Sequence, residues 1–272
     1  MAVTVDAVAT QFASIAGESS PKDIAAATFG LTIGTGSNRA LTVELVFVAT
    51  VTSPAFIWDQ GGTNQSATLI KSQAGVNGQL TCLFGLIAPT SGNKAVRVTW
   101  TGGTTEFHCQ AESWTLVNQT GGTTSFPNGV AATGNSNTAS VTVTSAVGNA
   151  TVSAAVAGSL QAISSVTATQ TFLIHGVGAI ESGGSRADGS ASNVMTATYA
   201  GTDQWAMVGM DILSDGAALP AVPGGSLMDD QWRRPSVLWS GTSTLGTKRS
   251  AWSDGDQNPA VAASRDYRSF NQ

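Results

Sequence analysis

The sequence predicts an all-β fold, an antiparallel β-sandwich of jelly-roll-like type, followed by an extended C-terminal arm. Three observations predict it. Apolar and polar residues alternate in many short runs, turn-forming clusters separate these runs, and no convincing helical pattern extends over ten residues. Hydrophobic residues make up 42% of the chain, so a sizeable core is available between Gly-, Ser- and Thr-rich turns.

The predicted strands follow one another at close spacing. The clearest alternating runs lie at 3–9, 41–48, 95–100, 140–144 and 205–213. The run at 41–48 becomes apolar on both faces. Gly- and Asn-containing turn clusters lie at 34–39, 61–64, 89–94, 101–103, 147–149 and 200–203. A short segment at 23–28 is the best helix candidate, with a turn as the alternative.

We interpret residues 1–213 as the body and 214–272 as the arm. Within the body, 25–118 and 137–213 each combine strand, Gly-Asn turn and strand, and residues 119–136 connect them. Two related units folded face to face would make a jelly roll. The alternative is that any two hairpins of this composition look alike.

The arm differs from the body in composition. It holds four of the eight prolines, six of the twelve Lys and Arg residues and three of the seven tryptophans. Pro220, Pro223, Pro235 and Pro259 exclude a central strand there. Burying three tryptophans yields about 15 kcal/mol, whereas ordering the arm costs about 60 kcal/mol or more, so it also needs backbone pairing or wide contact. The partner-binding residues that we predict are Trp232, Arg233, Arg234, Trp239, Trp252, Tyr267 and Phe270.

Charge and hydropathy exclude several classes of partner. The net charge is −5 and no basic stripe is present, so we expect no nucleic acid partner. Residues 1–18 lack the cationic start of a signal peptide. No stretch of eighteen uninterrupted apolar residues occurs, so we expect no membrane span and infer synthesis and folding in a cytoplasm.

No catalytic motif is present. His108 and His175 are the only histidines, and neither has a recognisable nucleophile and acid partner. His108 and Cys109 point to opposite faces of one strand, so they do not share a metal. Glu106 and Glu112 lie about 20 Å apart on one strand, too far for a glycosidase pair there, although a pair from separate strands stays open. We therefore expect a non-enzymatic protein without cofactor or metal.

The two cysteines, Cys82 and Cys109, both lie in strand-like runs. Cytoplasmic thiols are usually buried and reduced. A disulfide between them requires that their strands be neighbours.

Three motifs carry a resemblance to a known family. The stretches Gly36–Val43, Val96–Gly102 and Trp205–Leu213 resemble motifs of β-sandwich proteins encoded by tailed bacteriophages and prophages. The resemblance covers about 25–213 and excludes the arm. It implies a virion structural protein, and some such proteins decorate or cement capsids.

The hypothesis that we favour is a non-enzymatic virion protein that decorates or cements the capsid through its arm. Its partners would be the major capsid protein or other virion proteins and copies of itself, and its location the virion, assembled in the host cytoplasm. The alternative is a carbohydrate-binding module at a tail, baseplate or fibre, with Trp58 as ligand platform or, more simply, as core residue. A hydrolase ranks last.

Overall fold

The computed structural model describes residues 2–9, 12–158, 163–167, 171–172 and 182–216 of the chain. They belong to one compact unit, Met1–Leu219, which we call the body. Its strands pair antiparallel throughout, and its short helices are α1 (Ala26–Phe29) and the 3-10 turn Gly122–Ser125. The predicted all-β class is therefore confirmed. The segment 23–28, expected to be a short helix or a turn, is helical only from residue 26, because residues 23–24 end a strand.

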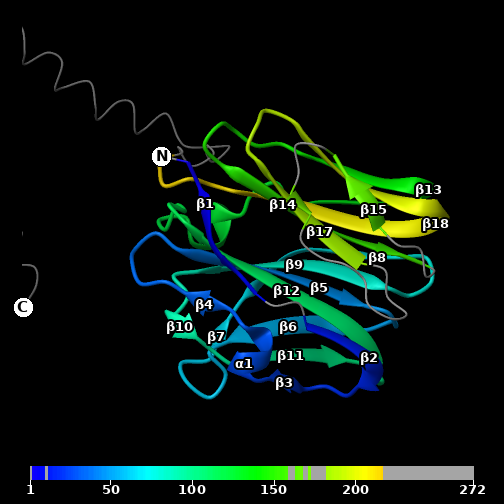
Figure 1. Ribbon diagram of the computed structural model, residues 1–272, viewed down its shortest axis with the longest axis horizontal. Coiled ribbons are helices and arrows are strands. Elements are labelled where there is room, and N and C mark those ends of the chain that lie inside the picture. The colour runs from blue at the N-terminus through cyan, green and yellow to red at the C-terminus, as the bar shows by residue number, and fades with distance from the viewer. Residues whose placement is uncertain (1, 10–11, 159–162, 168–170, 173–181, 217–272) are drawn as a thin grey trace, which may run out of the picture. The chain divides into compact units, whose positions relative to one another are not determined.

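The first half of the body contributes two larger sheets and a small one (Figure 1). The central sheet has the order β1 (Thr4–Val8), β12 (Thr105–Thr115), β5 (Ala40–Phe47), β9 (Leu80–Ile87) and β8 (Thr68–Ala74), with β2 (Phe12–Glu18) also on β12. The lower sheet has the order β3 (Lys22–Ile24), β11 (Val96–Thr101), β6 (Thr52–Trp58) and β7 (Gln65–Ser66). Strands β4 (Thr32–Ile33) and β10 (Gly92–Asn93) pair with each other.

The second half contributes the upper sheet. Its order is β13 (Val130–Val143), β18 (Asn193–Ile212), β14 (Ala150–Ala157), β17 (Ser182–Asp188) and β16 (Thr171–Phe172), with β15 (Ile163–Val166) also on β18. The segment expected to connect the halves, 119–136, is shorter than predicted, because β13 begins at Val130. The idea that the halves are related by duplication stays a prediction.

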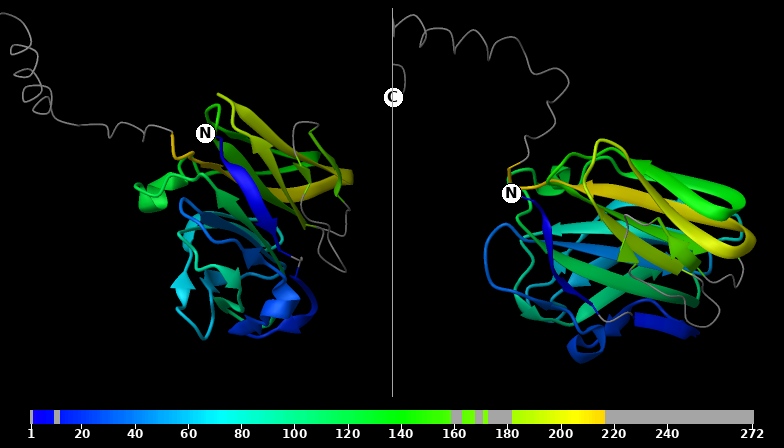
Figure 2. Two further views of the ribbon diagram at one scale, coloured as in Figure 1. Left: turned by 60° about the vertical axis from the view of Figure 1, so that its left-hand side comes forward. Right: turned by 45° about the horizontal axis from the view of Figure 1, so that its top comes forward.

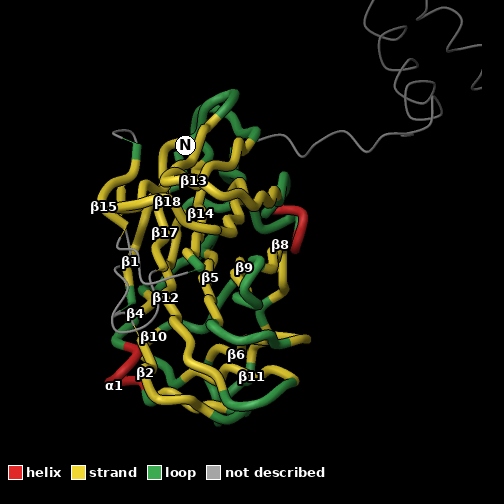
Figure 3. The backbone as a smooth tube through the Cα atoms, turned by 90° about the vertical axis from the view of Figure 1, so that its right-hand side faces the viewer, coloured by secondary structure: helices red, strands yellow, loops and turns green. Residues whose placement is uncertain are grey.

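The central sheet lies between the other two, as Figures 2 and 3 show. Its lower face packs Leu45, Phe47 and Phe107 on the lower sheet, where Phe56 and Trp58 are fully buried. A second core lies between its upper face and the upper sheet. The central sheet contributes Ala40, Leu83 and Trp114, and the upper sheet contributes Val152, Val208 and Met210. The body is thus a stack of three layers of antiparallel sheet, which is consistent with the β-sandwich that the sequence predicts. Because β5 is covered on both faces, all its residues are buried.

The ribbon of β13 and β18 folds back over the upper sheet. Its register changes between Ser136 and Thr138, and the two halves of β13 come together so that Val130 and Val143 both lie beside Gly209. A Cβ at Gly209 would lie 2.7 Å from a methyl group of Val143, so the close approach of β13 to β18 at this position needs a glycine. A third core fills the fold of the ribbon, with Val141, Met195, Tyr199, Trp205 and Met207.

The two cysteines are free and buried, and no disulfide joins them. Cys82 on β9 and Cys109 on β12 both pair with Leu45 of β5, one from each side. Two strand spacings therefore separate their Cα atoms by about 10 Å, beyond the reach of a disulfide. Burial raises the pKa of the Cys82 thiol to about 12 and that of Cys109 well above its ordinary value.

Candidate functional site

Polar side chains form a buried row between the central and upper sheets. In β12, alternation directs His108, Gln110 and Glu112 toward the upper sheet, and all three are buried. Glu44 of β5 pairs in register with Gln110, so it joins the same face one strand away. Such a row is unusual in a sandwich core because each polar atom that loses water needs a partner.

Arg186 of β17 provides the counter-charge to this row. Its Nη1 donates a hydrogen bond to Oε1 of Glu112 and forms an ion pair with it. The Arg186 side chain is 23% exposed, whereas that of Glu112 is 1% exposed. The pair therefore joins the buried row to the protein surface, and it fixes how β17 docks on β12.

Glu44 is the second buried acid of the row, with an exposed fraction of 2%. Desolvation raises its pKa well above the ordinary value, and the positive charge of Arg186 opposes that rise only in part. Burial in turn lowers the pKa of Arg186, and Glu44 opposes that change. Burial therefore favours the neutral, protonated form of Glu44, whereas Glu112 and Arg186 form the ion pair of the row.

Gly184 makes room for Glu44 on the facing strand. A Cβ at this glycine would lie 1.8 Å from Oε2 of Glu44 and 2.5 Å from its carboxyl carbon. Any larger residue at position 184 would displace the carboxyl group. The two strands are therefore complementary, with a bulky polar side chain on one and a glycine on the other.

His108 has a serine partner that the sequence did not indicate. Nδ1 of His108 lies 2.7 Å from Oγ of Ser182, at the start of β17. Both residues are buried, with exposed fractions of 1% and 0%. A nucleophile must reach its substrate, and this pair is enclosed between sheets, so it serves packing and hydrogen bonding in the described structure.

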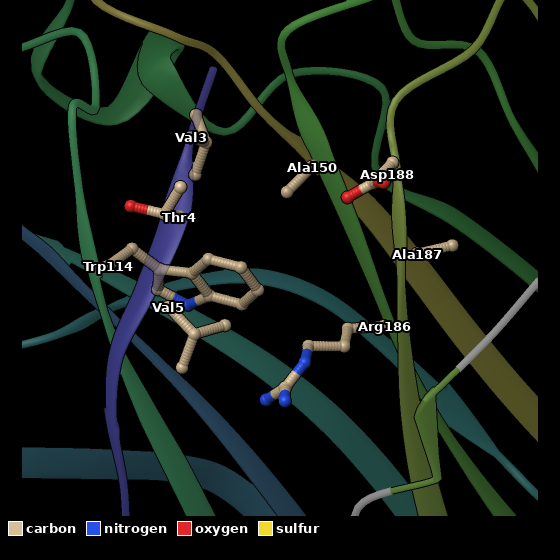
Figure 4. A pocket seen from close by; sticks show the side chains of 8 residues that line it. All are labelled: Val3, Thr4, Val5, Trp114, Ala150, Arg186, Ala187 and Asp188. Atoms are coloured by element: carbon tan, nitrogen blue, oxygen red, sulfur yellow. The ribbon is translucent and has the colours of Figure 1, made fainter.

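A pocket of about 270 Å³ opens where β1 faces β17 (Figure 4). Val3, Val5 and Ala150 give it apolar walls, the indole of Trp114 lies at one side, and Thr4, Arg186 and Asp188 supply its polar groups. Trp114 is only 2% exposed and its Nε1 donates to Oγ1 of Thr42, 2.8 Å away. Arg186 thus lines the pocket and also forms the ion pair with Glu112 of the buried row.

Trp58 has no exposed ring face for a ligand. It is fully buried, its Nε1 donates to the carbonyl oxygen of Thr90 at 2.9 Å, and its ring packs against Phe29. The structure therefore favours the core-packing interpretation over a sugar platform. The seven predicted arm residues, Trp232, Arg233, Arg234, Trp239, Trp252, Tyr267 and Phe270, and also His175, lie outside the described residues.

Sequence reasoning missed the pairing of Glu112, Glu44 and Arg186. Glu112 was compared with Glu106 on its own strand, whereas its partner Arg186 lies 74 residues away along the chain. One signal was present: Glu44 is the single charged residue of 40–47, a run that is apolar on both faces. A charge inside a doubly buried strand requires a partner from another sheet.

Among the described residues, no group of three or more His, Cys, Asp or Glu side chains is placed to hold a metal ion. No helix in that part of the chain is long and apolar enough to cross a membrane. No family model, curated protein or solved structure matches the chain. Proposals about its function therefore depend on its own residues.

Proposed function

We propose that this chain is a non-enzymatic structural protein of a bacteriophage virion, which decorates or cements the capsid through residues 214–272. The resemblance of three strand motifs supports the class of protein. The body supports a scaffold role, since the buried Glu112 is paired with Arg186 inside the body and the histidine–serine pair is enclosed. The observation that carries the proposal is the way the body holds the root of the arm.

The arm root, Leu213–Asp215, is hydrogen-bonded to four separate places in the body, at residues 38, 116–118, 125 and 149. The amide of Asn118 donates to the carbonyl oxygen of Leu213 at 2.9 Å, and the amide of Asp215 donates to the carbonyl oxygen of Leu116 at 2.7 Å. Oδ1 of Asn149 accepts from the amide of Ser214 at 3.0 Å. The first two residues of the predicted arm, Ser214 and Asp215, are thus bonded to the rest of the body.

A side-chain contact completes the root. Nδ2 of Asn38 donates to Oδ2 of Asp215 at 3.1 Å. Ser214 is buried and forms an isolated β-bridge with Val117. A segment that only ended the fold would need no such fixation, because chain termini are usually loosely held. Because the root is hydrogen-bonded to the body, a contact between the arm and a partner would also fix the position of the body on that partner.

Truncation of the arm tests this proposal. A chain that ends at Gly216 keeps the root, and we expect it to lose most of its affinity for phage particles that lack the protein, measured by co-sedimentation. The full chain with Trp232, Trp239 and Trp252 replaced by alanine should bind with intermediate affinity. Thermal unfolding of each variant shows whether the body is intact. Undiminished binding by the intact truncated chain would exclude the arm as the attachment element.

A carbohydrate-binding module of a tail, baseplate or fibre is the second candidate, and the pocket between β1 and β17 is the observation in its favour. Its volume and its polar groups on Thr4, Arg186 and Asp188 suit one sugar residue. A glycan array with the full chain tests it, and Asp188→Ala is the matched variant because this exposed residue is not needed for packing. If the full chain binds no glycan, or if Asp188→Ala weakens none of the glycans that bind, this candidate is eliminated.

A further inference from the structure

Strand β13 leaves one long backbone edge unpaired. Its hydrogen-bonded neighbour is β18, which pairs with it from Val130 to Val143. β14 and β15 lie on the far side of β18, so within the described structure nothing pairs with the outer edge of β13. An open edge of this kind presents a row of N–H and C=O groups to any strand that approaches.

The other sheet edges carry features that discourage pairing. β7 and β16 have two residues each, and β3 has three, with Lys22 and Asp23 among them. β8 has an irregular register next to Lys71, and β1 has one next to Asp6. β2 has an irregular register on β12 near Glu18, and β15 has four residues. Short length, charge and irregularity are the usual means by which proteins protect edge strands.

β13 has none of these protective features apart from its bend. Its sequence, VAATGNSNTASVTV, contains no charged residue and no proline. The bend near Asn137 divides it into two straight segments, Val130–Ser136 and Thr138–Val143, each about 20 Å long. Thr133, Asn135 and Thr142 are exposed. The edge is therefore long, neutral and accessible.

We propose that β13 is a homotypic interface, at which the β13 of a second copy of this chain pairs with it antiparallel. A neutral strand can approach its own copy without the repulsion that a charged edge would meet. Its Asn, Ser and Thr side chains are both donors and acceptors, so identical residues can bond one another across the interface. Antiparallel pairing of identical edges is two-fold symmetric, and each residue then contacts the copy in the same way.

The pairing closes at two copies. Among the described residues, the opposite edge of the upper sheet is β16, which has two residues, so the described part of the joined sheet offers no second long edge for growth. A closed pair avoids the open fibres that edge-to-edge association otherwise produces. This interface depends on β13 alone and stands whether or not the arm attaches the protein to a particle.

Sedimentation velocity of the full chain across a dilution series tests the interface. We expect a reversible monomer–dimer equilibrium. The double variant Thr133→Lys/Asn135→Lys places like charges on both edges and should weaken dimerisation at least about tenfold. Val147→Lys, at a turn position that is 93% exposed, is the matched control and should leave the equilibrium unchanged. A chain that stays monomeric throughout, or lysines on β13 with no effect, would overturn the proposal.

Cross-linking identifies what lies on the edge. Asn135→Cys adds one accessible thiol, whereas Cys82 and Cys109 are buried. A short bis-maleimide should join two Asn135→Cys chains into a covalent dimer, and two Val147→Cys chains should stay separate. If dimers form in solution but Asn135→Cys chains do not cross-link, another surface or another segment, such as 217–272, makes the contact and β13 is not the interface.

Discussion

Replacing Gly184 by alanine tests the complementarity between the upper and central sheets. The added Cβ would lie 1.8 Å from Oε2 of Glu44, and the carboxyl group is 2% exposed, with Arg186 beside it. β17 is held between β14 and β16, so the strand cannot move away without loss of pairing. Overpacking of this kind costs about 1–3 kcal/mol of the free energy of unfolding. For a body of this size, each kcal/mol lowers the melting temperature by about 2–4 °C.

Gly103→Ala is the matched control. It makes the same chemical change at a glycine whose added Cβ would meet nothing within 4 Å. We expect no loss of stability there, and a gain of up to about 1 kcal/mol is consistent with the smaller entropy of the unfolded chain. Urea denaturation followed by tryptophan fluorescence gives the free energy of unfolding of both variants.

The contact with Glu44 is isolated by a double-mutant cycle. In a Glu44→Ala background the carboxyl group is gone, so Gly184→Ala should cost at least about 1 kcal/mol less than in the natural chain. If Gly184→Ala is as stable as the natural chain, or if its cost is the same in both backgrounds, the steric argument is refuted.

Three further predictions concern the buried ionisable groups. Burial raises the pKa of Asp211 from 3.8 to about 6. The contribution of Asp211 to the free energy of unfolding is therefore complete below pH 3.8, and at most about 3 kcal/mol is lost as the pH rises through about 6. Asp211→Asn should flatten the pH dependence of unfolding in that interval, and an unchanged profile would contradict the assignment. Arg186→Met leaves Glu112 buried without its counter-charge and should cost about 3–5 kcal/mol in urea denaturation, whereas a loss below 1 kcal/mol would mean that water already screens the pair. Cys82 and Cys109 should resist a thiol reagent in the folded protein and both react in denaturant; a thiol count of zero in denaturant would indicate a disulfide.

The strands were predictable because alternation is a local property. The run at 41–48 is the clearest case: it was predicted as a strand, and its apolar character on both faces agrees with the position of β5 as the middle strand of the central sheet, buried along its whole length. The number of stacked sheets was not predictable in the same way. Which strands become neighbours depends on the packing of all three cores, and this also decides that β5 separates Cys82 from Cys109.

The buried row was harder to predict than the strands. Arg186 follows the glycines of 183–184 in a run without apolar alternation, so nothing in its local sequence marked it as the partner of Glu112. The sequence left two interpretations of Trp58, a ligand platform or, more simply, a core residue. The structure favours the second, since the ring is fully buried and its Nε1 donates to Thr90, 32 residues further along the chain.

The position of the arm root has a mechanical consequence. The chain beyond Gly216 continues from the end of β18, a strand of 20 residues that is flanked by β13 on one side and by β14 and β15 on the other. A pull directed along the last part of β18, once the bonds of the root have opened, would load its hydrogen bonds with β13 and with β14 together. Bonds loaded together resist far more force than bonds that open one at a time. The body is therefore built to keep its fold under tension applied through residues 217–272.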